Sequence, residues 1–250
     1  MSRNFELLSE AGRMHEVPHS VPEEPIAAPL HVEDTFSSTV SLEMSGAVRD
    51  EIGKLVQKLF LAPQGPRRVI FAGTESDSGC TWMSARIAEG LASQGRGSVC
   101  VVDCNFRSPG LHRQFGAENL VGLSDALLGS GSVREYTHRW SRNLWFLTGG
   151  SSSETGLSML GSERMRSRLA ELEMAFDYVL FDSAPLNGCN DAVILGGLTD
   201  GIVLVLKANS SRRQIARNAL QELHGAKVSV LGAVLNQRTF PIPEALYKRL

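Results

Sequence analysis

The chain has 250 residues, of which 42% are hydrophobic and 21% charged, and its formal net charge is -2. This composition is typical of a soluble globular protein that is long enough for an α/β domain with a buried core. The small net charge and the lack of a long basic run argue against a nucleic-acid partner. No apolar run approaches the roughly 20 residues that span a bilayer, and the N-terminus has no secretory signal, so a cytoplasmic location is expected. The four cysteines lack metal-binding spacing and are expected to be reduced.

Residues 1–44 predict a largely disordered tail. The tail contains four prolines, namely Pro18, Pro22, Pro25 and Pro29. Apolar side chains recur at helical spacing in its first dozen residues, which predicts a short N-terminal helix that would be marginal on its own. Residues 45–62 carry a longer apolar stripe and predict a second helix. This helix either packs on the domain or carries a self-association surface, and periodicity does not separate the two.

From Arg67 onward, short apolar runs alternate with helical segments. Strands are predicted at 69–72, 98–102, 144–147, 178–181, 201–206 and 230–235. Helices are predicted at 81–94, 122–128, 162–174, 191–198 and 211–224. Continuous apolar runs are typical of strands buried on both faces of a parallel sheet, and the alternation predicts one doubly wound α/β domain over residues 45–250. Such a sheet binds ligands beyond the carboxyl ends of its strands.

A polar loop follows the first predicted strand and reads GTESDSGCT from Gly73 to Thr81. It resembles a P-loop, in which backbone N–H groups surround phosphate oxygens and a Ser or Thr hydroxyl binds Mg²⁺. Cys80 stands where the P-loop lysine belongs and has no fixed positive charge, while Asp77 adds a negative one. The alternative is an ordinary β-to-α turn in which a polar side chain of the loop caps the helix. The candidate nucleotide-binding residues are Ser76, Asp77, Ser78, Gly79, Cys80, Thr81 and Trp82.

Two later strands also end in a carboxylate. Asp103 follows the run Val101–Val102, and Asp182 follows an apolar run that begins at Tyr178. An acidic residue at the end of an apolar strand orders Mg²⁺ in Walker B motifs. The candidate metal ligands are therefore Thr81, Asp103 and Asp182.

Six further segments carry a family pattern: MSRNFELL at 1–8, DCNFRSPGLH at 103–112, GLSDALLG at 122–129, LGSERM at 160–165, DYVLFDSAP at 177–185 and VLN at 234–236. On these segments the chain resembles bacterial tyrosine kinases (BY-kinases) and the CpsD/CapB-type partners of polysaccharide co-polymerases. The resemblance implies a doubly wound, mostly parallel sheet of the P-loop NTPase (MinD/ParA-like) type, with ATP and Mg²⁺ as cofactors. It also implies catalytic positions at Asp103, Asn105 and Asp182, and places Asn236 on the adenine side.

The departures from the family pattern concern the chemistry. Besides the missing lysine, Asn105 replaces an aspartate that is a candidate base for the tyrosine hydroxyl, and an amide cannot accept that proton. The family's assembly motif, Glu-x-x-Arg-x-x-Arg, corresponds to residues 51–57, where one charge is kept as Lys54 and the other is lost. The C-terminal tyrosine cluster of the family is reduced to Tyr247.

These losses favour a degenerate, pseudokinase-like regulatory protein of exopolysaccharide or capsule biosynthesis and export. Its expected partner is a membrane polysaccharide co-polymerase or an active BY-kinase, which would recruit it to the inner face of the cell membrane, and a homo-oligomer is also allowed. The first alternative is an active ATP-dependent tyrosine autokinase that controls polysaccharide chain length, with Arg86 or Arg107 replacing the lysine charge. The second is a MinD/ParA-like ATPase, although the loop lacks the two lysines of that class.

Overall fold

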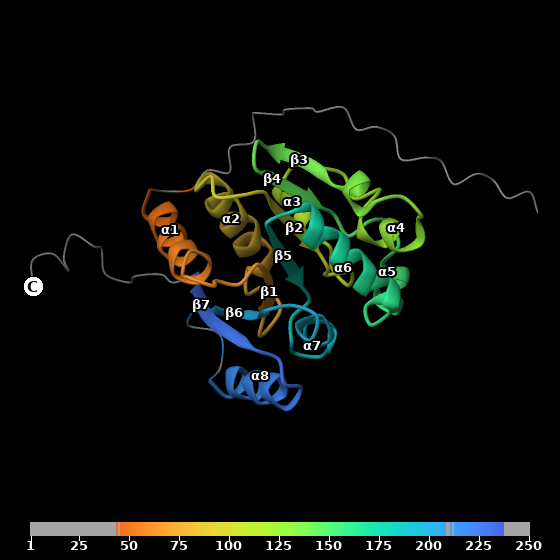
Figure 1. The fold of residues 1–250 in the computed structure, drawn as a ribbon. Coiled ribbons are helices and arrows are strands. Elements are labelled where there is room, and N and C mark those ends of the chain that lie inside the picture. The colour runs from red at the N-terminus through yellow and green to blue at the C-terminus, as the bar shows by residue number, and fades with distance from the viewer. Residues whose placement is uncertain (1–43, 45, 209–210, 212, 238–250) are drawn as a thin grey trace, which may run out of the picture. The chain divides into compact units, whose positions relative to one another are not determined.

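A seven-stranded sheet forms the centre of the domain in a computed structural model that describes residues 44, 46–208, 211 and 213–237 (Figure 1). The strands are β1 (Arg68–Gly73), β2 (Val99–Asp103), β3 (His138–Ser141), β4 (Leu144–Leu147), β5 (Tyr178–Ser183), β6 (Gly201–Lys207) and β7 (Val230–Asn236). Their order is β3-β4-β2-β5-β1-β6-β7, and every neighbouring pair is parallel except β3 with β4. The predicted doubly wound, mostly parallel sheet is therefore confirmed.

Helices connect the strands. They are α1 (Gly46–Phe60), α2 (Cys80–Ser93), α3 (Leu111–Gln114), α4 (Leu123–Leu128), α5 (Ser153–Met159), α6 (Glu163–Ala175), α7 (Asp191–Gly196) and α8 (Arg213–Gly225), with a 3₁₀ turn at Val133–Tyr136. All six strands and all six helices expected in the domain are present, and their ends lie within two residues of the prediction. The sequence analysis missed β3, α3, α5 and the 3₁₀ turn, which have four to seven residues each. No helix in the described part of the chain is long and apolar enough to cross a membrane.

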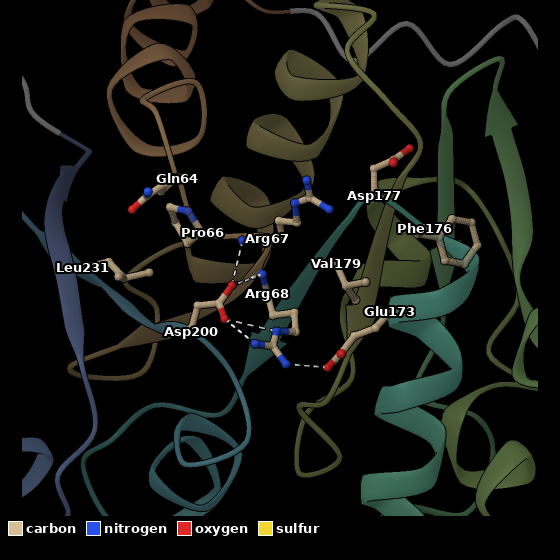
Figure 2. Close-up of a pocket in the computed structure, with 11 residues that line it drawn as sticks. Gln64, Pro66, Arg67, Arg68, Glu173, Phe176, Asp177, Val179, Asp200 and Leu231 are labelled. Atoms are coloured by element: carbon tan, nitrogen blue, oxygen red, sulfur yellow. Dashed lines mark hydrogen bonds and ion pairs between the residues drawn. The ribbon is translucent and has the colours of Figure 1, made fainter.

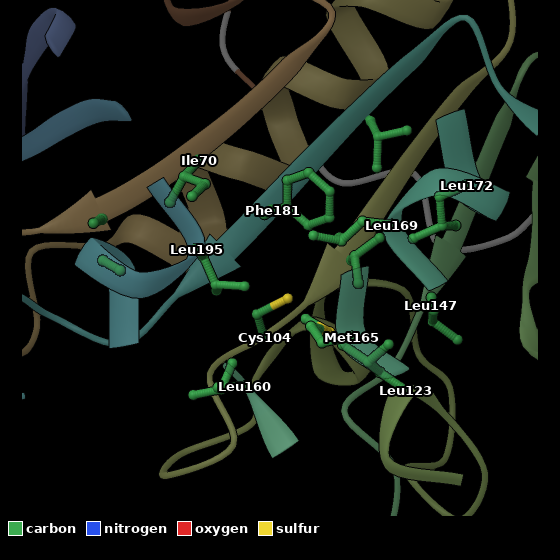
Figure 3. Close-up of a cluster of buried hydrophobic side chains, with 14 of the residues drawn as sticks. Ile70, Cys104, Leu123, Leu147, Leu160, Met165, Leu169, Leu172, Phe181 and Leu195 are labelled. Carbon is green, nitrogen blue, oxygen red and sulfur yellow. The ribbon is translucent and has the colours of Figure 1, made fainter. Parts of the chain in front are cut away.

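The central strands β1, β2 and β5 are buried on both faces, because successive strand residues point to opposite sides and each side packs against helices. Val69 and Phe71 of β1 pack against α1 and α2, whereas Ile70 and Ala72 belong to a second cluster with α4, α6 and α7. Figure 3 shows part of this second cluster, with Phe181 of β5 between the sheet and α6. Burial on both faces explains why the strands read as continuous apolar runs.

The predicted apolar stripe of α1 packs on the domain. Ile52, Val56 and Phe60 are buried and belong to the cluster formed with α2. The approach is close, because a Cβ added to Gly90 of α2 would lie 2.9 Å from Ile52 Cγ2. Self-association through α1 stays a prediction, and the tail at residues 1–43 and Tyr247 lie outside the described residues.

Candidate functional site

A cavity of about 480 Å³ lies at the carboxyl ends of the strands. Its lining includes every residue of the predicted phosphate loop except the buried Thr74, together with Trp82 and Asn105. Asp103 and Asp182 are fully buried, and β2 and β5 place them directly opposite each other as register partners. The parallel sheet thus brings together strand ends that are far apart in the sequence, as its topology requires.

The loop between β1 and α2 has the backbone of a phosphate-binding turn. Gly79 adopts a left-handed conformation with φ 78° and begins α2 without a side-chain cap. Asp77 is also left-handed, with φ 60°, a conformation that glycine adopts without the steric cost that other residues incur. No polar side chain of this loop caps the helix, so the alternative of a side-chain-capped turn is not supported.

Two side chains at the end of β7 hold this loop by hydrogen bonds to its backbone. The Asn236 amide donates to the carbonyl of Ser78 (2.9 Å), and the Gln237 amide donates to that of Asp77 (3.3 Å). A Cβ on Gly79 would collide with Asn236 Nδ2, so only glycine fits there. Asn236 therefore lies against the phosphate loop and supports its shape. Its predicted role on the adenine side stays a prediction.

Cys80 carries no charge at this site. Burial raises the pKa of its thiol well above the ordinary value, and the nearby Asp182 carboxylate raises it further. The side chain that replaces the P-loop lysine is therefore a neutral thiol next to a carboxyl group. Phosphate oxygens would find no counter-charge there.

The Asp103 carboxylate is held by backbone donors. Oδ1 accepts the N–H of Asn105 (3.0 Å), and Oδ2 accepts the N–H groups of Gly110 and Leu111 (2.9 Å each). Burial nevertheless raises the pKa of Asp103 to about 6, while these three donors and the charge of Arg113 act in the opposite direction. The segment that follows β2 is thus folded around this carboxylate.

Asp182 is different, because neither of its buried oxygens has a hydrogen-bond partner among the described residues. Burial and then the charge of Asp103 raise the pKa of Asp182 to about 8, although Thr81 and Cys80 lie close enough to lower it in part. A buried carboxylate without partners calls for a specific explanation. A bound cation would satisfy it.

The donor set fits Mg²⁺ in particular. Mg²⁺ keeps several waters and takes one or two carboxylates together with substrate phosphates. Asp103, Asp182 and the Thr81 hydroxyl match that requirement, whereas no group of three His, Cys, Asp or Glu side chains in the described residues forms an all-protein metal site. The predicted metal residues are therefore brought together, and their ligand role stays a prediction.

The predicted base position, Asn105, lies at the cavity wall. Its side-chain oxygen accepts the N–H of Ser108 (3.2 Å), which fixes the turn that follows β2. The Asn105 amide therefore has a structural hydrogen-bond partner, and it cannot act as a general base.

The two arginines suggested as replacements for the lysine are both engaged elsewhere. Arg86 has no exposed surface, pairs with Glu89 (2.8 Å) and does not line the cavity, so that suggestion is wrong. Arg107 lines the cavity but binds Asp191 with two hydrogen bonds, of 2.9 and 3.2 Å. The sequence analysis missed Arg113 of α3, which lines the cavity as well. The signal was a basic residue directly after the DCNFRSPGLH segment.

A second cavity, of about 590 Å³, lies at the opposite end of the sheet (Figure 2). Its charges neutralise one another: Arg68 binds Asp200 (2.6 Å) and Glu173 (2.7 Å). Asp200 also accepts the backbone N–H groups of Arg67 and Arg68. These contacts tie the starts of β1 and β6 together, so this region is structural.

The known proteins that the chain resembles in sequence include tyrosine-protein kinases. It is 33% identical over 154 residues to the tyrosine-protein kinase YwqD of Bacillus subtilis, covering 61% of this chain and 65% of that protein. It is 28% identical over 214 residues to the putative tyrosine-protein kinase CapB of Staphylococcus aureus, covering 84% and 90%. No family model matches the chain.

A solved structure shares the fold. The chimerical protein CapA2B2 superposes with a TM-score of 0.72 over 76% of this chain and 85% of that one, at 20% identity. At this identity the likeness shows the fold alone, and it agrees with the predicted P-loop NTPase type. Together, the sequence relatives and the shared fold show that the chain is similar to bacterial tyrosine kinases (BY-kinases) and CapB-type proteins.

Proposed function

We propose that this protein is a regulatory member of the bacterial tyrosine kinase (BY-kinase) family, acting in exopolysaccharide or capsule biosynthesis and export with weak or absent kinase activity. The observation that carries the proposal is the neutral Cys80 thiol where the phosphate-binding lysine belongs. Two unit charges about 4 Å apart attract by roughly 4 kcal/mol at an effective dielectric of 20. Losing an attraction of that order weakens nucleotide binding by up to about a thousandfold.

The site keeps the parts that would hold a nucleotide. The backbone of the loop would surround the phosphates, and Thr81, Asp103 and Asp182 would hold Mg²⁺. When bound, Mg²⁺ neutralises phosphate charge. What the site lacks is a base, because the Asn105 amide cannot take the proton of a tyrosine hydroxyl.

The small number of tyrosines that could accept a phosphate also supports weak or absent kinase activity. The chain has three tyrosines. Tyr136 is buried, and Tyr178 lies in β5 with its ring edge-on to Phe60 at 6.0 Å. Tyr247 is then the one candidate for autophosphorylation near the C-terminus. A regulatory protein would act by docking on a membrane polysaccharide co-polymerase or on an active kinase of the family.

The active autokinase is the second candidate, favoured by the retained carboxyl pair. Calorimetry and mass spectrometry of the purified full chain decide between the two. We expect Mg-ATP to bind more weakly than about 0.1 mM and no phosphotyrosine to form after incubation with Mg-ATP. Micromolar binding, or phosphate on Tyr247, would establish the kinase instead. An active relative treated in parallel provides the positive control.

A further inference from the structure

Arg113 reaches the phosphate end of the cavity from a different element than the loop. It belongs to α3, which follows the Asp103 segment, and its side chain lines the cavity beside Gly110 and Thr81. A Cβ added to Gly110 would lie 3.3 Å from Arg113 Nη2 and 3.6 Å from the Thr81 hydroxyl oxygen. The guanidinium and the predicted metal-binding hydroxyl therefore face the same small space.

The charge of Arg113 acts on the buried carboxylate of Asp103. It lowers the pKa of Asp103, which burial otherwise raises. In the described part of the chain the guanidinium has one hydrogen bond, a 3.3 Å contact from Nη2 to the carbonyl of Pro109. Arg107, the other arginine at the cavity, is held in two hydrogen bonds by Asp191.

We propose that Arg113 supplies the positive charge that Cys80 cannot, and that it binds the polyphosphate of a nucleotide. This inference rests on the proposed nucleotide site. A guanidinium presents its N–H donors as a planar fork that matches two phosphate oxygens, so Arg113 can replace part of what a lysine provides. The charge then comes from α3 instead of the loop and acts beside the metal position.

Asp182, buried directly before the cavity-lining Ser183, is an independent sign that a charged ligand binds at this end of the site. No hydrogen bond of normal geometry reaches either of its buried oxygens in the described residues, and the Thr81 hydroxyl and the Cys80 thiol lie beside it. A Mg²⁺–polyphosphate would place its metal at the carboxylates and its phosphate oxygens toward the guanidinium. The Mg²⁺ ion would then lie beside the negative carboxylates, and the phosphate oxygens beside the positive guanidinium of Arg113.

The test measures binding of Mg-ATP, Mg-ADP and adenosine to the full chain by NMR titration up to about 20 mM. Arg113→Gln should weaken Mg-ATP binding at least about tenfold and change adenosine binding less than about twofold. Arg113→Lys keeps the positive charge without the planar fork of donors, so its affinity for Mg-ATP should lie between those of the wild type and Arg113→Gln. Arg142→Gln is the matched control, because Arg142 is an exposed arginine between β3 and β4, away from the cavity lining.

The possible failures are distinguishable. If Arg113→Gln binds Mg-ATP within about twofold of the wild type, the role of Arg113 is wrong and the nucleotide site stands. If the variant loses adenosine and Mg-ATP equally, Arg113 is structural and the proposal is also wrong. If the wild-type chain binds none of the three ligands, both the inference and the nucleotide site are refuted.

Discussion

Asp182→Asn tests whether the carboxyl pair is a site built for a cation. The folded-state pKa of Asp182 is raised to about 8 from an ordinary value of 3.8. Between about pH 4 and pH 8 the Asp182 carboxyl therefore keeps its proton in the native protein and has lost it in the unfolded chain. Stability must fall as pH rises through this window, because ionisation costs more in the native state. An asparagine cannot ionise and escapes this loss.

The expected magnitude follows from the same shift. Each pKa unit corresponds to about 1.4 kcal/mol, and Asp182 is fully buried, so wild-type stability should drop by up to about 4 kcal/mol between pH 5 and pH 8 relative to the variant. At pH 5 the protonated carboxyl and the amide are both neutral and alike in shape. The two proteins should then differ by less than about 1 kcal/mol.

The assay is urea unfolding of the metal-free protein at several pH values from 5 to 9, with EDTA present. Asp103→Asn is the matched control, because Asp103 accepts three backbone N–H groups. An amide nitrogen in place of one oxygen leaves at least one donor without an acceptor, at a cost of about 1–3 kcal/mol at pH 5. This variant also loses the ionisation of Asp103 and its repulsion of Asp182, so its stability should fall less steeply with pH than that of the wild type but more steeply than that of Asp182→Asn. Parallel pH curves for the wild type and Asp182→Asn would refute the raised pKa and, with it, the electrostatic argument for a cation.

Two further predictions concern the phosphate loop. Cys80→Lys combined with Asp77→Gly should raise Mg-ATP affinity at least about tenfold in calorimetry, because it adds the missing positive charge and removes a negative one. The control Cys80→Ala should leave the affinity unchanged. No gain in the double variant would mean that the loop does not bind phosphate. Gly79→Ala should destabilise the protein by about 2 kcal/mol or more in urea, because the site is left-handed and closed by Asn236. The cost should shrink in an Asn236→Ala background, and an equal cost in both backgrounds would exclude the steric contact.

The strands that carry the site could be predicted because they are continuous apolar runs. β3 could not, since it is a short, half-exposed antiparallel edge strand without such a run. Asp103 and Asp182 were each expected at a strand end. That they are partners in register, and that their proximity helps to raise the pKa of Asp182, depends on the order of β2 and β5 in the sheet.

The contacts within the site between segments that are distant in the sequence could not be predicted from the sequence. Asn236 reaches the carbonyl of Ser78 across 158 positions, and no spacing rule relates them. Arg113 was overlooked for a similar reason: its importance comes from α3 lying beside Thr81. Arg86 was closer in sequence to the missing lysine, but the face of α2 that carries it is buried.

The site separates two properties that a P-loop lysine usually joins. Phosphate binding by a backbone turn depends on N–H groups and on left-handed positions such as Gly79, and these survive the loss of side-chain charge. Transfer to tyrosine needs a proton acceptor in addition, and Asn105 is not one. If Arg113 returns the charge from another wall of the cavity, the expected result is a protein that senses a nucleotide without transferring its phosphate.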